Sequence, residues 1–119
     1  MKPMTILLIT ACTGLLAGCA ISAPPRELSD ARQAYSHASA SPSTQFVPAE
    51  LREAREALVR AERSFQDDPD SQLTRNFAAH AYRKAKLAAA MGASASDSAA
   101  TAKAGKTLQT RGADLVKQK

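Results

Sequence analysis

Apolar residues recur at alternating spacings of three and four along two stretches of the chain. This spacing puts them on one narrow face of a helix, which is the face that helices use to pack on one another. We call this face the seam, and its positions are Leu28, Ala31, Tyr35, Leu51, Ala54, Leu58, Ala61 and Phe65. Charged side chains occupy the other faces of both stretches and predict that those faces are solvated.

The two stretches begin with the same pattern. Residues 25–34 and 48–57 both read P-x-E-L-x-x-A-R-x-A, with an offset of 23 residues. Proline suits the first helical position because its missing N–H would have no partner there. The glutamate two residues later favours the positive end of the helix dipole. The repeat therefore predicts two helices that start at Pro25 and Pro48, with residues 36–47 forming a loop between them.

A third helix is predicted over residues 69–91. Asp68 is a good N-cap, Pro69 a good first helical residue, and Gly92 is expected to end the helix. Beyond it, residues 92–119 are rich in Ala, Ser and Lys, and Gly105 and Gly112 weaken a helix by about 1 kcal/mol each. We expect this tail to be partly helical or disordered.

The pattern predicts an all-α fold, namely a small antiparallel helical hairpin or three-helix bundle over residues 25–91. Its large apolar side chains are few, so the core of so short a chain is marginal. The sequence therefore indicates a thin structure, or one that self-association completes.

The N-terminus has a different character. A positive start is followed by the uncharged residues 5–17. A run of about 13 residues is shorter than the roughly 20 that a membrane-spanning helix needs. The run is typical of a signal peptide, here residues 1–18.

The signal ends in Leu16-Ala17-Gly18-Cys19, which resembles the bacterial lipobox. The resemblance implies diacylglycerol transfer to the thiol of Cys19, cleavage before it, and usually a further acyl chain on the new amine. Residues 19–24 would be a lipidated tether, since several acyl chains anchor a protein stably. Ala20 stands where an aspartate tends to retain enteric lipoproteins in the inner membrane. We therefore expect an outer-membrane lipoprotein that faces the periplasm.

Charge adds one feature. The formal net charge is +5, and the tail is basic, with Lys103, Lys106, Arg111, Lys117 and Lys119. Such a tail favours anionic surfaces such as lipid headgroups or peptidoglycan. Nucleic acid is not an expected partner, because no aromatic residues are interleaved with the basic ones.

Catalytic chemistry has little support. The histidines, His37 and His80, form no metal-ligand spacing, and Cys12 would leave with the signal peptide. No Gly-x-Ser-x-Gly elbow or glycine-rich phosphate loop occurs. We expect no metal, no cofactor and no enzyme activity.

Residues 48–62, PAELREAREALVRAE, and 81–92, AYRKAKLAAAMG, are similar to helical bacterial lipoproteins grouped as domain of unknown function 4398. In longer relatives such a domain precedes an OmpA-like peptidoglycan-binding domain, which we do not expect in this chain. The resemblance implies a helical lipoprotein and supplies no reaction.

These observations favour a non-enzymatic structural or adaptor role. The expected contacts are the membrane, through acyl chains on Cys19, and an envelope protein or a second copy, through helix–helix packing. The alternative is contact with the cell wall through the basic tail.

Overall fold

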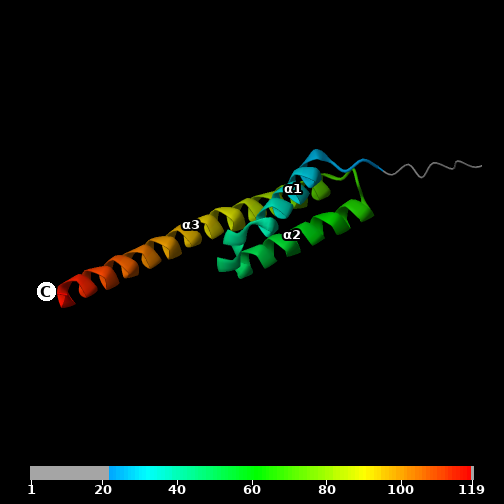
Figure 1. Cartoon of the computed structure of the whole chain (residues 1–119). Helices are drawn as coiled ribbons and strands as arrows, with labels where there is room; N and C mark the ends of the chain where they lie inside the picture. The colour runs from blue at the N-terminus through cyan, green and yellow to red at the C-terminus, as the bar shows by residue number, and fades with distance from the viewer. Residues whose placement is uncertain (1–21, 119) are drawn as a thin grey trace, which may run out of the picture.

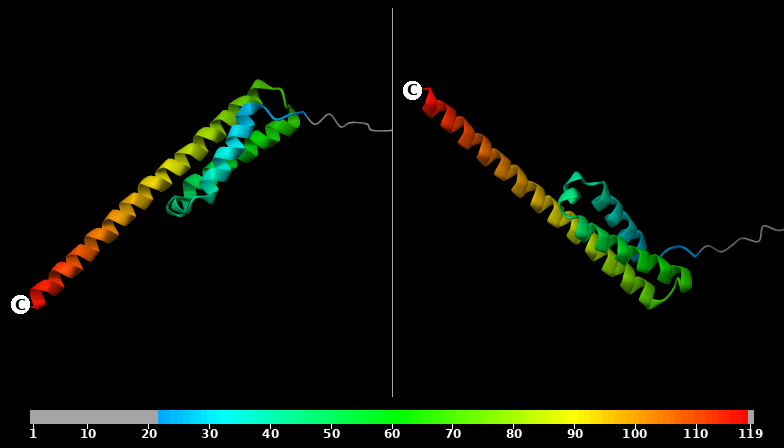
Figure 2. Two further views of the ribbon diagram at one scale, coloured as in Figure 1. Left: turned by 45° about the horizontal axis from the view of Figure 1, so that its top comes forward. Right: turned by 90° about the horizontal axis from the view of Figure 1, so that it is seen from below.

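The computed structural model describes residues 22–118 and shows an all-α chain, which confirms the predicted fold class. Its elements are α1 (Arg26–Ala40), the short 3₁₀ helix η1 (Pro42–Phe46), α2 (Pro48–Asp67) and α3 (Gln72–Lys117). α1 and α2 run antiparallel, and α3 turns back along both of them (Figure 1). The three helices pack together at one end of an elongated molecule, and the second half of α3 projects from them (Figure 2).

The two repeated helix starts are both used. Pro48 is the first residue of α2. Pro25 lies one position before α1, where its carbonyl accepts hydrogen bonds from the N–H groups of Leu28 and Ser29 at 3.0 and 3.2 Å. The predicted start of α1 is thus displaced by one residue.

The predicted start of α3 is wrong by three residues. Ser71, not Asp68, is the N-cap, and its hydroxyl accepts a hydrogen bond from the N–H of Thr74 at 3.0 Å. Asp68 instead follows the last turn of α2, where its N–H donates to the carbonyl of Ser64 at 2.9 Å. The four-residue turn 68–71 thus closes one helix and caps the next.

The segment predicted as a loop is more ordered than expected. α1 continues to Ala40, and η1 occupies most of the remainder. The Thr44 side chain is buried, and its hydroxyl lies 3.0 Å from the carbonyl oxygen of Ala38 and 2.7 Å from that of Ser41. These contacts hold η1 against the end of α1.

Gly92 does not end α3, so the predicted helix boundary at residue 91 is wrong. The glycine lies under η1, where an added Cβ would be 3.0 Å from the carbonyl oxygen of Ser43 and 3.2 Å from the Cα of Thr44. A side chain there would collide with backbone. Glycine at this position serves close packing, and the helix continues through it to Lys117.

The continuation of α3 leaves much of it without neighbours. The helix has 46 residues, which is about 69 Å at 1.5 Å per residue. Every residue from 97 to 117 is exposed. This segment of α3, residues 97–117, is the free half, and it is about 32 Å long.

The core is built from small side chains. One layer combines Leu28, Ala61 and Ala78, one residue from each helix. The next layer combines Ala31, Ala57 and Ala81, each no more than 1% exposed. Alanine at these contacts lets the helix axes approach closely. The bundle is therefore thin, as its few large apolar residues suggested.

Candidate functional site

The structure brings most of the seam together in the core between the three helices. Leu58 is half-buried and packs against both core layers, and Phe65 packs against the Leu28 layer. The fully buried seam residues are Leu28, Ala31, Ala54 and Ala61. These six residues make contacts within the chain and leave little of the seam for another protein.

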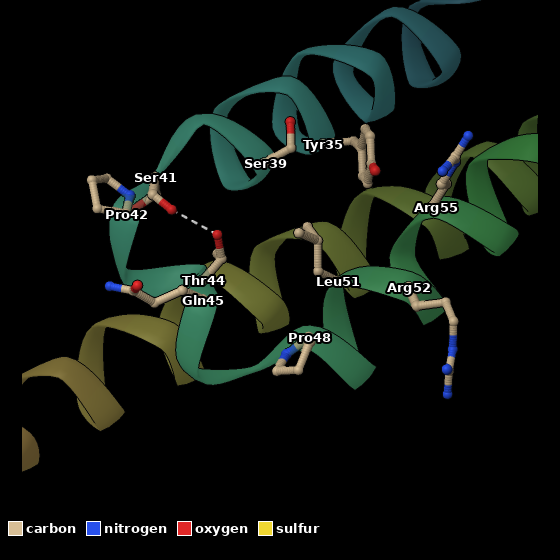
Figure 3. A pocket seen from close by; sticks show the side chains of 10 residues that line it. All are labelled: Tyr35, Ser39, Ser41, Pro42, Thr44, Gln45, Pro48, Leu51, Arg52 and Arg55. Carbon is tan, nitrogen blue, oxygen red and sulfur yellow. Dashed lines mark hydrogen bonds between the residues drawn. The ribbon is translucent and has the colours of Figure 1, made fainter.

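The other two seam residues, Tyr35 and Leu51, lie outside these core layers. Both are half-buried and face a shallow open hollow between the end of α1, η1 and the start of α2 (Figure 3). Arg52 and Arg55 also line it. The other lining residues are Ser39, Ser41, Pro42, Thr44, Gln45 and Pro48. The lining contains hydroxyls and guanidinium groups but no carboxylate or imidazole that would act as a general base.

Two ion pairs tie the helices together at the surface. Arg32 of α1 donates two hydrogen bonds to Glu62 of α2, each 2.6 Å long. Lys84 of α3 donates to Glu53 of α2 at 2.7 Å. The hydrogen bond to Glu62 raises the pKa of Arg32. The hydrogen bond and charge of Lys84 lower the pKa of Glu53. Both pKa shifts therefore follow from ion pairs that join α2 to its neighbouring helices.

A buried hydroxyl cluster holds the turn between α2 and α3. Thr74 is fully buried, and its hydroxyl lies 2.7 Å from that of Ser64 and 2.9 Å from that of Ser71. It also lies 2.9 Å from the carbonyl oxygen of Asp68. Each hydroxyl has a partner, so the cluster fixes the turn and presents no free nucleophile.

The histidines are not placed for metal binding. His37 and His80 are exposed on different helices. Within residues 22–118, no group of three or more His, Cys, Asp or Glu side chains is arranged to hold a metal ion. Asp68 and Asp70 belong to the turn 68–71, and Asp67 is the last residue of α2.

A feature that the sequence reasoning missed is an uncharged line along α3, which we call the stripe. Its residues are Leu87, Met91, Ser94, Ser98, Thr101, Gly105, Leu108, Gly112 and Leu115, at alternating spacings of four and three. Leu87, Met91, Leu108 and Leu115 are 50%, 39%, 70% and 68% exposed. The spacing alone would have revealed it, but serine, threonine and glycine at its centre lower its hydropathy. Among the described residues, no helix is long and apolar enough to cross a membrane.

The other residues that the sequence singled out lie on the free half of α3 or outside the described residues. Lys103, Lys106, Arg111 and Lys117 are exposed on the free half of α3. Cys19 and Lys119 lie outside the described residues. The described chain begins at Ser22, shortly before α1.

The fold and these surfaces define an elongated, three-helix, all-α protein with a projecting terminal helix. The family model "Domain of unknown function (DUF4398)" matches residues 26–104, and the chain belongs to this family. The match starts at the first residue of α1 and reaches into the free half of α3. The resemblance seen in the sequence is thereby confirmed, and it extends past Met91. No curated protein and no solved structure matches the chain significantly.

Proposed function

We propose that this protein is a lipid-anchored envelope lipoprotein that faces the periplasm and acts without catalysis, as a structural or adaptor element that makes helix–helix contacts. The observation that carries the proposal is Leu16-Ala17-Gly18-Cys19 at the end of an uncharged run, six residues before Pro25. Ala20 favours the outer membrane as the anchoring site.

The direction of the chain supports this role. Leu28, near the start of α1, packs with Ala61 and Ala78, near the turn between α2 and α3. The N-terminal side therefore enters the bundle at the end opposite to the free half of α3 (Figure 1). A lipid on Cys19 would hold one end of the molecule and leave the long helix free to reach a partner.

The arrangement of the polar groups supports a role in binding other molecules more than a role in catalysis. The hydroxyls of Thr44 and Thr74 are engaged in turns, and the close ion pairs join neighbouring helices. What the fold presents to its surroundings is helix surface, above all on α3.

The test is the intact mass and membrane fractionation of the expressed protein beside a Cys19→Ser variant. We expect the wild type to lose residues 1–18, to gain acyl mass and to sediment with the outer membrane. The variant should lack the acyl mass. If both proteins are soluble and unacylated, the lipoprotein proposal is wrong.

A second candidate function is contact with peptidoglycan, favoured by the exposed Lys103, Lys106, Arg111 and Lys117 on the free half of α3. Cosedimentation with isolated sacculi tests it. Binding should fall as salt rises, because exposed charges are screened. It should fall further in the Lys103→Glu, Lys106→Glu double variant. Binding that neither change affects would rule out the basic face.

A further inference from the structure

The stripe on α3 is an uncharged face without a covering element among the described residues, and its large apolar side chains are Leu87, Met91, Leu108 and Leu115. α1, α2 and η1 cover a different face of α3, which carries Ala81, Ala85, Ala88 and Gly92. Leu87 and Met91 lie beside the bundle and remain half exposed, so the stripe runs uninterrupted from the bundle onto the free half.

The free half needs a partner for physical reasons. Helical stability in proteins comes mainly from packing of one face, and residues 97–117 have no such packing because all of them are exposed. Gly105 and Gly112 weaken this segment of the helix further. Alternating spacings of three and four, sustained over 29 residues, are those of the a and d positions of a coiled coil, and Leu87, Met91, Leu108 and Leu115 supply large apolar side chains toward its ends.

Side-chain size favours a second copy in antiparallel orientation. In one register Met91 faces Leu115 of the second copy, and Ser98 faces Leu108 of the second copy. By symmetry each contact occurs twice. At the centre, Thr101 faces Gly105 of the second copy. Leu108 thus meets a small side chain and no bulky residues clash, while the layers of Ser94 with Gly112 and of Thr101 with Gly105 are loosely filled.

Charge selects the same register. Asp97 and Arg111 flank the stripe on the same side. When Met91 lies against Leu115 of the second copy, Asp97 lies beside Arg111 of the second copy, again twice. A parallel pair would instead place Asp97 beside Ala102, so charge favours the antiparallel pair.

We propose that the stripe pairs two copies of this chain as an antiparallel coiled coil over residues 89–117. The two helices overlap over about 43 Å. The two Gln72 residues, at the outer ends of the paired α3 helices, lie about 93 Å apart. With both copies anchored in one membrane, the rod would lie along its surface. The pairing rests on the proposed adaptor role and specifies a second copy of this chain as the partner. It does not depend on lipidation of Cys19.

Cysteine crosslinking tests the register. The chain is purified in mild detergent as cells produce it, and protein without an added cysteine gives the background. Met91→Cys and Leu115→Cys chains are treated, separately and mixed, with a short bifunctional thiol reagent. We expect covalent dimers well above background in the mixture alone. Leu108→Cys is the matched control, because its copies would be offset by about 15 Å in this register.

Exchanging the charges at positions 97 and 111 tests the register independently of crosslinking. Asp97→Arg should weaken the dimer about tenfold in analytical ultracentrifugation, since it replaces two attractions by two repulsions. Adding Arg111→Asp should restore it. Crosslinking of each single variant with itself would show a parallel pair and overturn the proposal. A chain that is monomeric at 100 μM, on the order of the concentrations where weak pairs form, would also overturn it. Intact mass from the same preparation reports lipidation separately.

Discussion

Gly92→Ala is the substitution that tests the packing of η1 on α3 most directly. Alanine favours a helix over glycine by about 1 kcal/mol, so the change would stabilise an unobstructed helix. Here the new Cβ would lie 3.0 Å from the carbonyl oxygen and 3.1 Å from the carbonyl carbon of Ser43. Both are backbone atoms, and the adjacent Thr44 hydroxyl ties η1 to α1, so the obstacle does not rotate away.

The expected change in the free energy of unfolding is the gain in helix propensity minus the cost of overpacking. Overpacking costs about 1–3 kcal/mol, which exceeds the propensity gain over most of that range. We expect a net loss of about 1 kcal/mol, which lowers Tm by about 4–8 °C in a domain of this size. Gly92→Val should lose more, since valine is both larger and a poorer helix former.

Gly105→Ala is the matched control, because no atom lies within 4 Å of the Cβ that would be added. Thermal unfolding is followed by circular dichroism at 222 nm and low micromolar concentration, where chain association contributes little. The control should gain helical signal without a fall in Tm. If Gly92→Ala raises Tm, the close approach of η1 to α3 is not what selects glycine at this position.

Three further substitutions test the core, the turn and an ion pair. Leu28→Ala should destabilise the fold by about 2–5 kcal/mol in urea titration, because Leu28 is the largest fully buried apolar side chain; a loss below 1 kcal/mol would show that its layer contributes little. Thr74→Val should cost about 0.5–1.5 kcal/mol, since it removes the hydrogen bond from the Thr74 hydroxyl to the carbonyl of Asp68, whereas Thr74→Ser keeps the hydroxyl and should cost less. Glu53→Gln should lower Tm at pH 7 because it removes the pair with Lys84. The lowered pKa of Glu53 means that this contribution is present above the ordinary pKa of 4.5 and is lost as pH falls through the lowered pKa, so the difference in Tm should shrink as pH falls below 4.5 and should not be larger there than at pH 7.

The sequence was sufficient to predict the helices of the bundle because their signals are local. Pro48 starts α2 where a proline without an N–H is tolerated, and the spacing of Leu28 and Ala31 identifies the face that α1 buries. The same local signals identified the family. The lipidation of Cys19, in contrast, is predicted from a motif that lies outside the described residues.

The elements that were wrong depend on contacts between distant segments. Gly92 has the composition of a helix stop, and only the position of η1 shows that it is a packing residue. Asp68 and Ser71 are both good N-caps, and the choice between them depends on where Thr74 is buried. Thr44 orders a segment that looks like a loop, because its hydroxyl bonds to the end of α1. None of these relations has a periodic signature.

The distribution of side-chain size around α3 is the strongest argument that its role lies outside its own bundle. In an ordinary bundle helix the largest apolar residues face the core. Beside α1 and α2, the fully buried positions of α3 are Thr74, four alanines and Gly92, and Phe77 packs against the Leu28 layer, whereas Leu87 and Met91 stay 50% and 39% exposed. Stability of the bundle alone would be better served by the reverse arrangement, since burying each such side chain contributes about 1.5–3 kcal/mol. A helix with a small face for close packing inside and a large apolar face outside is suited to two contacts at once, and the second of them is the one the proposed pairing supplies.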